Sequence, residues 1–129
     1  MRARLGHSDR GVVGTTVAIL FPGVLFLIML AVQAGLYWHA NQRAEAAADR
    51  AASVAARVDG TQASGESAGW AFLEAAPLND ANVSVNRATT RAEATVSGTA
   101  PRLVPVIAWQ VTAHAAVEVE RFVAEPDRQ

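Results

Sequence analysis

The side chains of this sequence that could do chemistry are few and lie far apart. Its three histidines, His7, His39 and His114, occupy separate parts of the chain, and there is no cysteine. Neither a Cys/His zinc site nor a thiolate nucleophile is therefore predicted. No phosphate-binding glycine loop, Glu-x-x-His motif or Ser-His-Asp order occurs. We predict no catalytic, cofactor-binding or metal-binding residues, and a protein that is not an enzyme.

The carboxylates and the overall charge likewise indicate no catalytic or nucleic-acid-binding site. Glu118 and Glu120 alternate with apolar residues, so they are expected on one solvated face of a strand, as is His114. Glu74 and Glu93 stand alone. The formal net charge is −1, and no basic stripe is present that could neutralise phosphates. Nucleic acid is therefore not a predicted partner.

The element that dominates the chain is an apolar segment near the N-terminus. No charged side chain occurs between Arg10 and Arg43, and the run from Gly11 to Trp38 is almost uninterrupted apolar. Since about 20 helical residues cross a hydrocarbon core of about 30 Å, this run predicts a transmembrane helix over residues 12–38. Tyr37 and Trp38, which end the run, are predicted to anchor it at the level of the lipid headgroups, with His39 as a polar anchor beside them.

The flanking charges predict an orientation for this helix. Three arginines precede the span against one aspartate, whereas the first charges after it, Arg43 and Glu45, cancel. The positive-inside bias places the N-terminus in the cytoplasm and the C-terminal domain outside. A cleaved export signal, with Val32 and Ala34 as its small residues, is the alternative. The apolar run is about twice the 7–15 residues of a signal core, which favours a retained single-pass anchor.

Several residues within the span predict contact with other helices. Pro22 frees a backbone carbonyl and indicates either an ordinary membrane kink or a bend that lets subunits pack. Ala31 and Gly35 form a small-xxx-small pair that would let two helix backbones approach closely. Gln33 could donate a hydrogen bond across such a contact.

Beyond the span the pattern predicts a continuation of the same helix. Small apolar residues recur at helical spacing over residues 39–58 without a breaker, so the helix is expected to extend over 39–59 and stop at Asp59-Gly60. This alanine stripe suits packing against a sheet or against sister helices. A second, short helix is predicted over residues 68–76, capped by Ser67, with a turn at Asn79-Asp80.

The rest of the chain alternates with a period of two. Residues 82–86, 91–98 and 110–123 predict three strands of an antiparallel meander, joined over 103–109 by a short helix or an irregular connection. The predicted fold class is α+β: a long N-terminal transmembrane helix that continues into an exported helix packed on a small antiparallel β-meander. The predicted regions are a basic leader (1–11), the span (12–38), its alanine-rich extension (39–59) and an exported domain (60–129).

This architecture and several local motifs resemble the TadE-like family of tight-adherence pilus assembly proteins, within the pilin and pseudopilin superfamily. The matching motifs are the pair Arg10-Gly11, the proline Pro22 within the apolar helix, and the aromatic exit Leu36–Ala40. The closing segment 111–121 is also similar. The resemblance implies a minor pseudopilin-like component of a tight-adherence, type IV-like pilus assembly or secretion system. It further implies an inner-membrane location, other pilin-like subunits as partners, and a prepilin peptidase that cuts between Gly11 and Val12.

The chain departs from the family pattern at one position. The fifth residue after Gly11 is Thr16, where the family has a glutamate. In pilins that glutamate is thought to pair with the amino terminus of a neighbouring subunit, and Thr16 offers a hydroxyl at the same place in the predicted packing surface. The residues alone leave a second function open, a standalone single-pass protein whose exported domain binds an envelope or protein ligand without processing.

Overall fold

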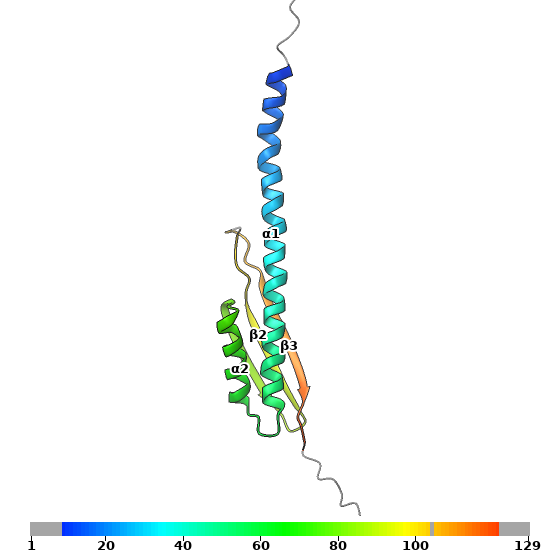
Figure 1. The fold of residues 1–129 in the computed structure, drawn as a ribbon, viewed down its shortest axis with the longest axis vertical. Coiled ribbons are helices and arrows are strands. Elements are labelled where there is room, and N and C mark those ends of the chain that lie inside the picture. Colours follow the sequence, from blue (N-terminus) through cyan, green and yellow to red (C-terminus); the bar gives the residue numbers. More distant parts are fainter. Residues whose placement is uncertain (1–8, 104, 122–129) are drawn as a thin grey trace, which may run out of the picture.

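The protein consists of one long helix whose C-terminal half is packed into a small α+β domain (Figure 1). The computed structural model describes residues 9–103 and 105–121, with side chains from Gly14 onward. The elements are α1 (Asp9–Ala56), α2 (Gln62–Ala75), β1 (Asn79–Arg87), β2 (Arg91–Thr99) and β3 (Gln110–Glu118). With 48 residues, α1 is about 72 Å long, so it extends well past the domain at its N-terminal end. The predicted α+β fold is confirmed.

The three strands form the predicted meander, with the order β1-β2-β3 and antiparallel pairing throughout. Both helices cover the same face of this sheet, α1 against β2 and β3, and α2 against β1 and α1. The strands accordingly alternate between residues buried beneath the helices and residues on the open face. The open face is polar, which is the usual pattern of an antiparallel sheet with one side in water.

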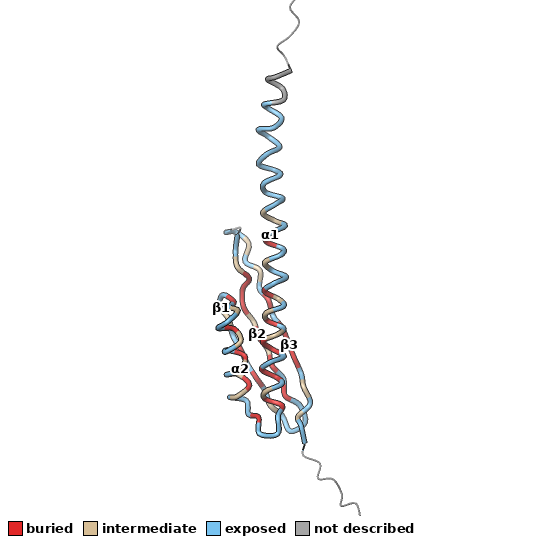
Figure 2. The backbone as a smooth tube through the Cα atoms, in the orientation of Figure 1, coloured by how far each residue is buried: buried red, intermediate tan, exposed pale blue. Residues whose placement is uncertain are grey.

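The core is built from small helix residues set against branched strand residues. From Ala40 to the end of α1, every buried residue of the helix is alanine. Alanine lets the helix axis lie close to the sheet, and Val96 and Val111 of β2 and β3 fill the space between them. Figure 2 shows burial confined to the C-terminal half of α1. The buried alanines are Ala40, Ala44, Ala47, Ala48, Ala51, Ala52, Ala55 and Ala56.

Two glycines let α2 approach α1 and the sheet more closely than any side chain would allow. A Cβ on Gly65 would lie 2.8 Å from the carbonyl oxygen of Ala51 and 2.8 Å from Cβ of Ala55. A Cβ on Gly69 would lie 2.8 Å from Cγ1 of Val83 in β1. The packing of α2 therefore depends on the absence of side chains at these two positions.

The predicted helix ends were wrong by several residues. The second helix begins at Gln62 and not near residue 68, because Thr61 and Ser64 form a reciprocal capping box, and Ser67 lies exposed inside the helix. The first helix ends at Ala56, three residues before the predicted stop. Val58, predicted to belong to the apolar stripe, lies beyond this end and is 62% exposed.

The end of α1 is held by partners from distant parts of the chain. Arg87 of β1 donates from Nε to the carbonyl of Ala55 (2.6 Å) and from Nη2 to that of Arg57 (3.1 Å). The amide of Glu120 donates to the carbonyl of Ala56 (2.9 Å). These bonds satisfy carbonyls that a helix end leaves without an intrahelical partner.

The strands also differ from the prediction at their ends. The predicted turn at Asn79-Asp80 is part of β1, where an irregularity in register between Asn79 and Asn82 accommodates Asp80 at φ 49°. The third strand ends at Glu118 and not at residue 123, because the next residues leave the sheet toward the end of α1; residues 122 and 123 lie outside the described residues. The connection between β2 and β3 is irregular, one of the two forms predicted.

Candidate functional site

The most unusual surface of the molecule is the N-terminal half of α1. No residue from Gly14 to Val32 is buried, and large apolar side chains point outward in every direction around the helix, among them Ile19, Phe21 and Leu27. The most apolar part has a mean hydropathy of 2.5 with none of it buried. A helix that is apolar all round requires an apolar environment. This half of α1 is long and apolar enough to span a bilayer, consistent with membrane anchoring.

The residues predicted to pack against other helices lie mostly on this exposed half. Thr16, Pro22 and Ala31 are exposed, and α1 remains helical through Pro22. Beyond the neighbouring backbone of α1 itself, a Cβ on Gly35 would have no atom of this chain within 4 Å. Ala31 and Gly35 are one helical turn apart, so they leave a shallow, accessible face on α1. Gly11 and Val12 belong to α1 by their backbone, and their side chains are outside the described residues.

Gln33 has neighbours that differ from those predicted. It is the first fully buried residue along the described part of α1, and its amide binds the connection between β2 and β3. Nε2 donates to the carbonyl of Pro101 (3.1 Å), and Oε1 accepts from the amide of Leu103 (2.8 Å). The amide predicted to cross between helices is therefore used within the chain. Nothing in the sequence could pair it with a segment 70 residues away.

The aromatic residues at the end of the predicted span divide between two environments. The ring of Tyr37 packs edge-on against Trp109, with centroids 5.3 Å apart and planes at 87°. Trp38 is 62% exposed. Together with Gln33, Tyr37 attaches the connection between β2 and β3 to α1 just beyond its exposed apolar half.

Replacing Gln33 by leucine should open this attachment without unfolding the domain. The amide of Leu103 and the carbonyl of Pro101 would lose their partner, and an unsatisfied buried polar group costs about 1–3 kcal/mol. We expect the amide of Leu103 to exchange its hydrogen roughly 5–150-fold faster, since 1.4 kcal/mol is about tenfold. Amide exchange measured on the full chain tests this. Unchanged exchange at Leu103, with the exchange of β2 also unchanged, would contradict the role given to Gln33.

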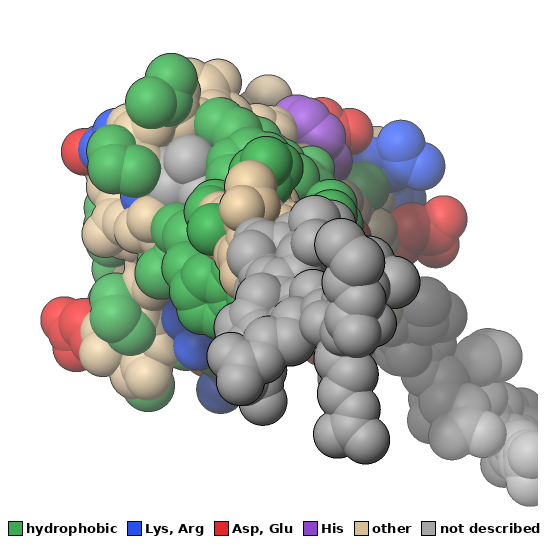
Figure 3. All heavy atoms as spheres, turned by 90° about the horizontal axis from the view of Figure 1, so that it is seen from above, with side chains coloured by type: hydrophobic (Ala, Val, Ile, Leu, Met, Phe, Trp, Pro, Cys, Tyr) green, Lys and Arg blue, Asp and Glu red, His purple; other side chains and the backbone are tan. Residues whose placement is uncertain are grey.

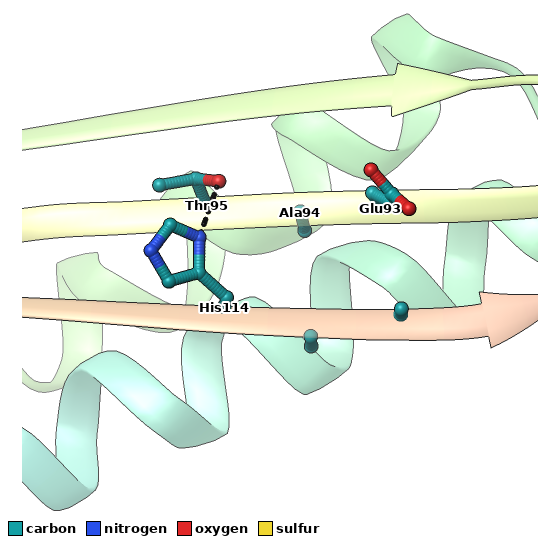
Figure 4. Close-up of a pocket in the computed structure, with 6 residues that line it drawn as sticks. Glu93, Ala94, Thr95 and His114 are labelled. Atoms are coloured by element: carbon teal, nitrogen blue, oxygen red, sulfur yellow. Dashed lines mark hydrogen bonds between the residues drawn. The ribbon is translucent and has the colours of Figure 1, made fainter.

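The open face of the sheet carries a shallow hollow of about 270 Å³ between β2 and β3. In it, Oγ1 of Thr95 and Nδ1 of His114 are 3.0 Å apart, and Glu93 lies apart from this pair along β2 (Figure 4). The carboxylate of Glu93 lies 3.8 Å from Arg91 at the surface. His114 is thus on the solvent side of its strand, as predicted, and its polar neighbour is a threonine. Among the described residues, no group of three His, Cys, Asp or Glu could hold a metal.

Comparison with known proteins identifies one segment. Residues 17–53 match the family model described as TadE-like protein. The match includes Pro22, Ala31, Gln33 and Gly35, and it ends within the buried alanine stripe of α1. Comparison with curated proteins and with solved structures gives no match. The resemblance to the TadE-like family is thus confirmed over residues 17–53.

Proposed function

We propose that the protein is a membrane-anchored, minor pseudopilin-like subunit of a tight-adherence, type IV-like pilus assembly or secretion system. It acts by helix packing with partner subunits and not by catalysis. The observation that carries the proposal is the exposed apolar half of α1, residues 14–32, of which residues 17–32 lie within the TadE-like segment. A helix of this kind can join others laterally within a bilayer, which is how a subunit is held before assembly.

The surface that meets partners is the N-terminal part of α1 and not its alanine stripe. Ala44, Ala47 and Ala51 are fully buried against the chain's own sheet and second helix, so sister helices have no access to them. Ala31 and Gly35 are accessible. In lipid, small residues of this kind allow backbones to approach, and van der Waals packing drives the association.

Substituting leucine for Gly35 should weaken association with partners and leave membrane insertion intact. A Cβ at this position would meet no atom within 4 Å beyond the neighbouring helix backbone, so we expect the effect of the added bulk to fall on neighbouring molecules. We expect site-specific crosslinking to partner subunits in the native host to decrease, while the variant stays in the membrane pellet after alkaline carbonate. Ala34→Leu, which adds bulk on an adjacent, exposed face of α1, is the matched control. Equal crosslinking by Gly35→Leu and the unsubstituted chain would count against the packing role.

The proposal also includes the N-terminus in the cytoplasm and removal of the leader there. In cells that contain a prepilin peptidase, the mature mass should correspond to loss of residues 1–11, and replacing Gly11 should preserve the full mass. A mature protein with an intact N-terminus in such cells would favour the standalone single-pass alternative. Mass spectrometry of the protein from the native host distinguishes the two.

A further inference from the structure

We propose that the β2–β3 loop is a second membrane-contacting element of this protein. The loop comprises residues 100–109, of which position 104 lies outside the described residues. Leu103, Pro105 and Val106 enter the headgroup region of the bilayer that α1 spans, at the C-terminal end of the span. The inference rests on the membrane anchor of the proposed function and adds that the sheet domain touches the same bilayer.

The level of the loop along α1 follows from Gln33. The exposed half of α1 from Gly14 to Val32 measures about 28 Å, close to the hydrocarbon thickness of about 30 Å. The next residue, Gln33, binds the backbone of Pro101 and Leu103. In Figure 1 the loop reaches up beside α1, away from the rest of the domain. The loop is therefore attached where a membrane spanned by this helix would end.

The composition of the loop fits this position. Between Pro101 and Trp109, Arg102 is the only charged residue. Val106 is 91% exposed and Leu103 is 44% exposed, so the domain itself does not cover them. Surface loops are usually rich in polar turn residues. Apolar side chains gathered beside a membrane span are instead suited to the lipid interface, where the exposed cation of Arg102 can reach lipid phosphates.

The backbone of the loop is arranged for a region that is poor in water. Gln33 binds one carbonyl and one amide of the loop, and the amide of Ala100 donates to the carbonyl of Trp109 (2.9 Å). Unsatisfied backbone groups are costly in hydrocarbon. A loop with an irregular backbone therefore belongs in the interface and not in the bilayer core, and the buried amide of Gln33 pairs two of its polar groups.

Aromatic residues mark the same level. Tyr37 of α1 contacts Trp109 of the loop edge-on, and the exposed Trp38 follows Tyr37 on the same turn of α1. Tyrosine and tryptophan favour the headgroup region because their rings are apolar and their polar atoms still reach water. Two segments far apart in the sequence thus contribute to one aromatic belt.

The bilayer is a better occupant for this surface than a partner protein, because the surface is continuous with the span. Seen from the N-terminal end of α1, hydrophobic side chains gather around the helix, and most charged side chains lie toward the rim (Figure 3). Any membrane crossed by α1 would face this side of the domain.

Single-cysteine labelling tests the proposal on the full chain, which has no native cysteine. Val106→Cys is labelled with an environment-sensitive fluorophore in phosphatidylcholine/phosphatidylglycerol vesicles at high lipid-to-protein ratio. We expect a blue shift and quenching by lipids that carry a nitroxide near the headgroup. Thr89→Cys, in the exposed turn between β1 and β2, is the matched control and should show neither effect.

A third position separates this proposal from the membrane anchor itself. Leu27→Cys lies in the exposed half of α1 and should be quenched by nitroxides deep in the acyl chains. If Leu27→Cys is quenched and Val106→Cys behaves like Thr89→Cys, the loop does not touch the membrane and the inference is overturned, while the anchor stands. If Leu27→Cys is not quenched, the membrane anchor itself is wrong, and the inference about the loop, which rests on it, is overturned as well. The label on Val106→Cys could also be blue-shifted but not quenched by lipid nitroxides. If this variant then crosslinks to a second protein molecule, the loop contacts protein and not lipid, and the inference is overturned.

Discussion

Gly65→Leu is expected to unfold much of the α+β domain. Its Cβ alone would lie 2.8 Å from the carbonyl oxygen of Ala51 and 2.8 Å from Cβ of Ala55. Neither neighbour can rotate away, because one is helix backbone and the other is a side chain of a single carbon. Overpacking typically costs about 1–3 kcal/mol and occasionally more, and a domain of this size has little stability to lose. We expect the free energy of unfolding to fall by about 3 kcal/mol.

The measurement is urea denaturation of the full chain in detergent, followed by tryptophan fluorescence and supported by limited proteolysis. Ser67→Leu is the matched control, because it adds the same side chain to an exposed position of α2 and should change stability by no more than about 0.5 kcal/mol. Gly65→Ala tests the sign of the change in the free energy of unfolding. Alanine in a helix interior normally stabilises by about 1 kcal/mol relative to glycine, and here it should destabilise. A gain in stability for Gly65→Ala would contradict the close approach of the two helices.

Arg87→Ala is expected to destabilise the junction between α1 and the sheet by about 2–3 kcal/mol. A hydrogen bond to a charged group is worth about 1.5–3 kcal/mol, and of the two that Arg87 donates only the one to Ala55 is partly buried, while the one to Arg57 is exposed and adds little. The guanidinium of Arg87 donates to the carbonyls of Ala55 and Arg57, where the helix dipole favours a positive charge. Without it, the carbonyl of Ala55 loses this donor, whereas the carbonyl of Arg57 keeps the amide of Gly60 (2.9 Å). The last turn of α1 should then fray. The same denaturation measurement reports the loss, and amide exchange in the last turn of α1 locates it.

The control for this prediction is another arginine on the neighbouring strand. Arg91 makes only a long ion pair with Glu93 (3.8 Å), and both side chains are largely exposed, so Arg91→Ala should change stability by about 0–0.5 kcal/mol. Arg87→Lys retains the charge and loses the fork of two donors, so it should recover part of the stability. Equal losses for Arg87→Ala and Arg91→Ala would show that the arginine does not cap the helix.

Elements with a strong local pattern could be predicted from the sequence. Elements that depend on contacts between distant segments could not. The apolar run and the alanine-rich segment indicated α1 because neither contains a breaker that ends a helix, apart from a proline that a membrane helix tolerates. Alternating residues indicated all three strands. The first half of α2 was missed because its polar residues and Gly65 indicate a loop, whereas Gly69 lies in the half that was predicted. In the folded chain these glycines are favoured, since their missing side chains admit Ala51, Ala55 and Val83.

Part of the candidate site could likewise be predicted from the sequence, and part could not. Length and composition predicted a helix able to cross a membrane and the aromatic residues at its end. The role of Gln33 could not be predicted, because an amide within an apolar helix is compatible with any polar partner. Its partners, Pro101 and Leu103, are brought to it by the path of β2 along α1.

By itself, the sequence determined the apolar helix, the alternation of the three strands and the family resemblance, because length, periodicity and motif spacing are properties of consecutive residues. Only the tertiary structure decided that the alanine stripe is buried against the chain's own sheet and second helix. It also decided that α1 ends at Ala56, where Arg87 caps it, and that an irregular loop is bound to Gln33. The physical reason is that each of these outcomes depends on hydrogen bonds and packing between segments distant in the chain. The fold as a whole determines which of these segments come into contact.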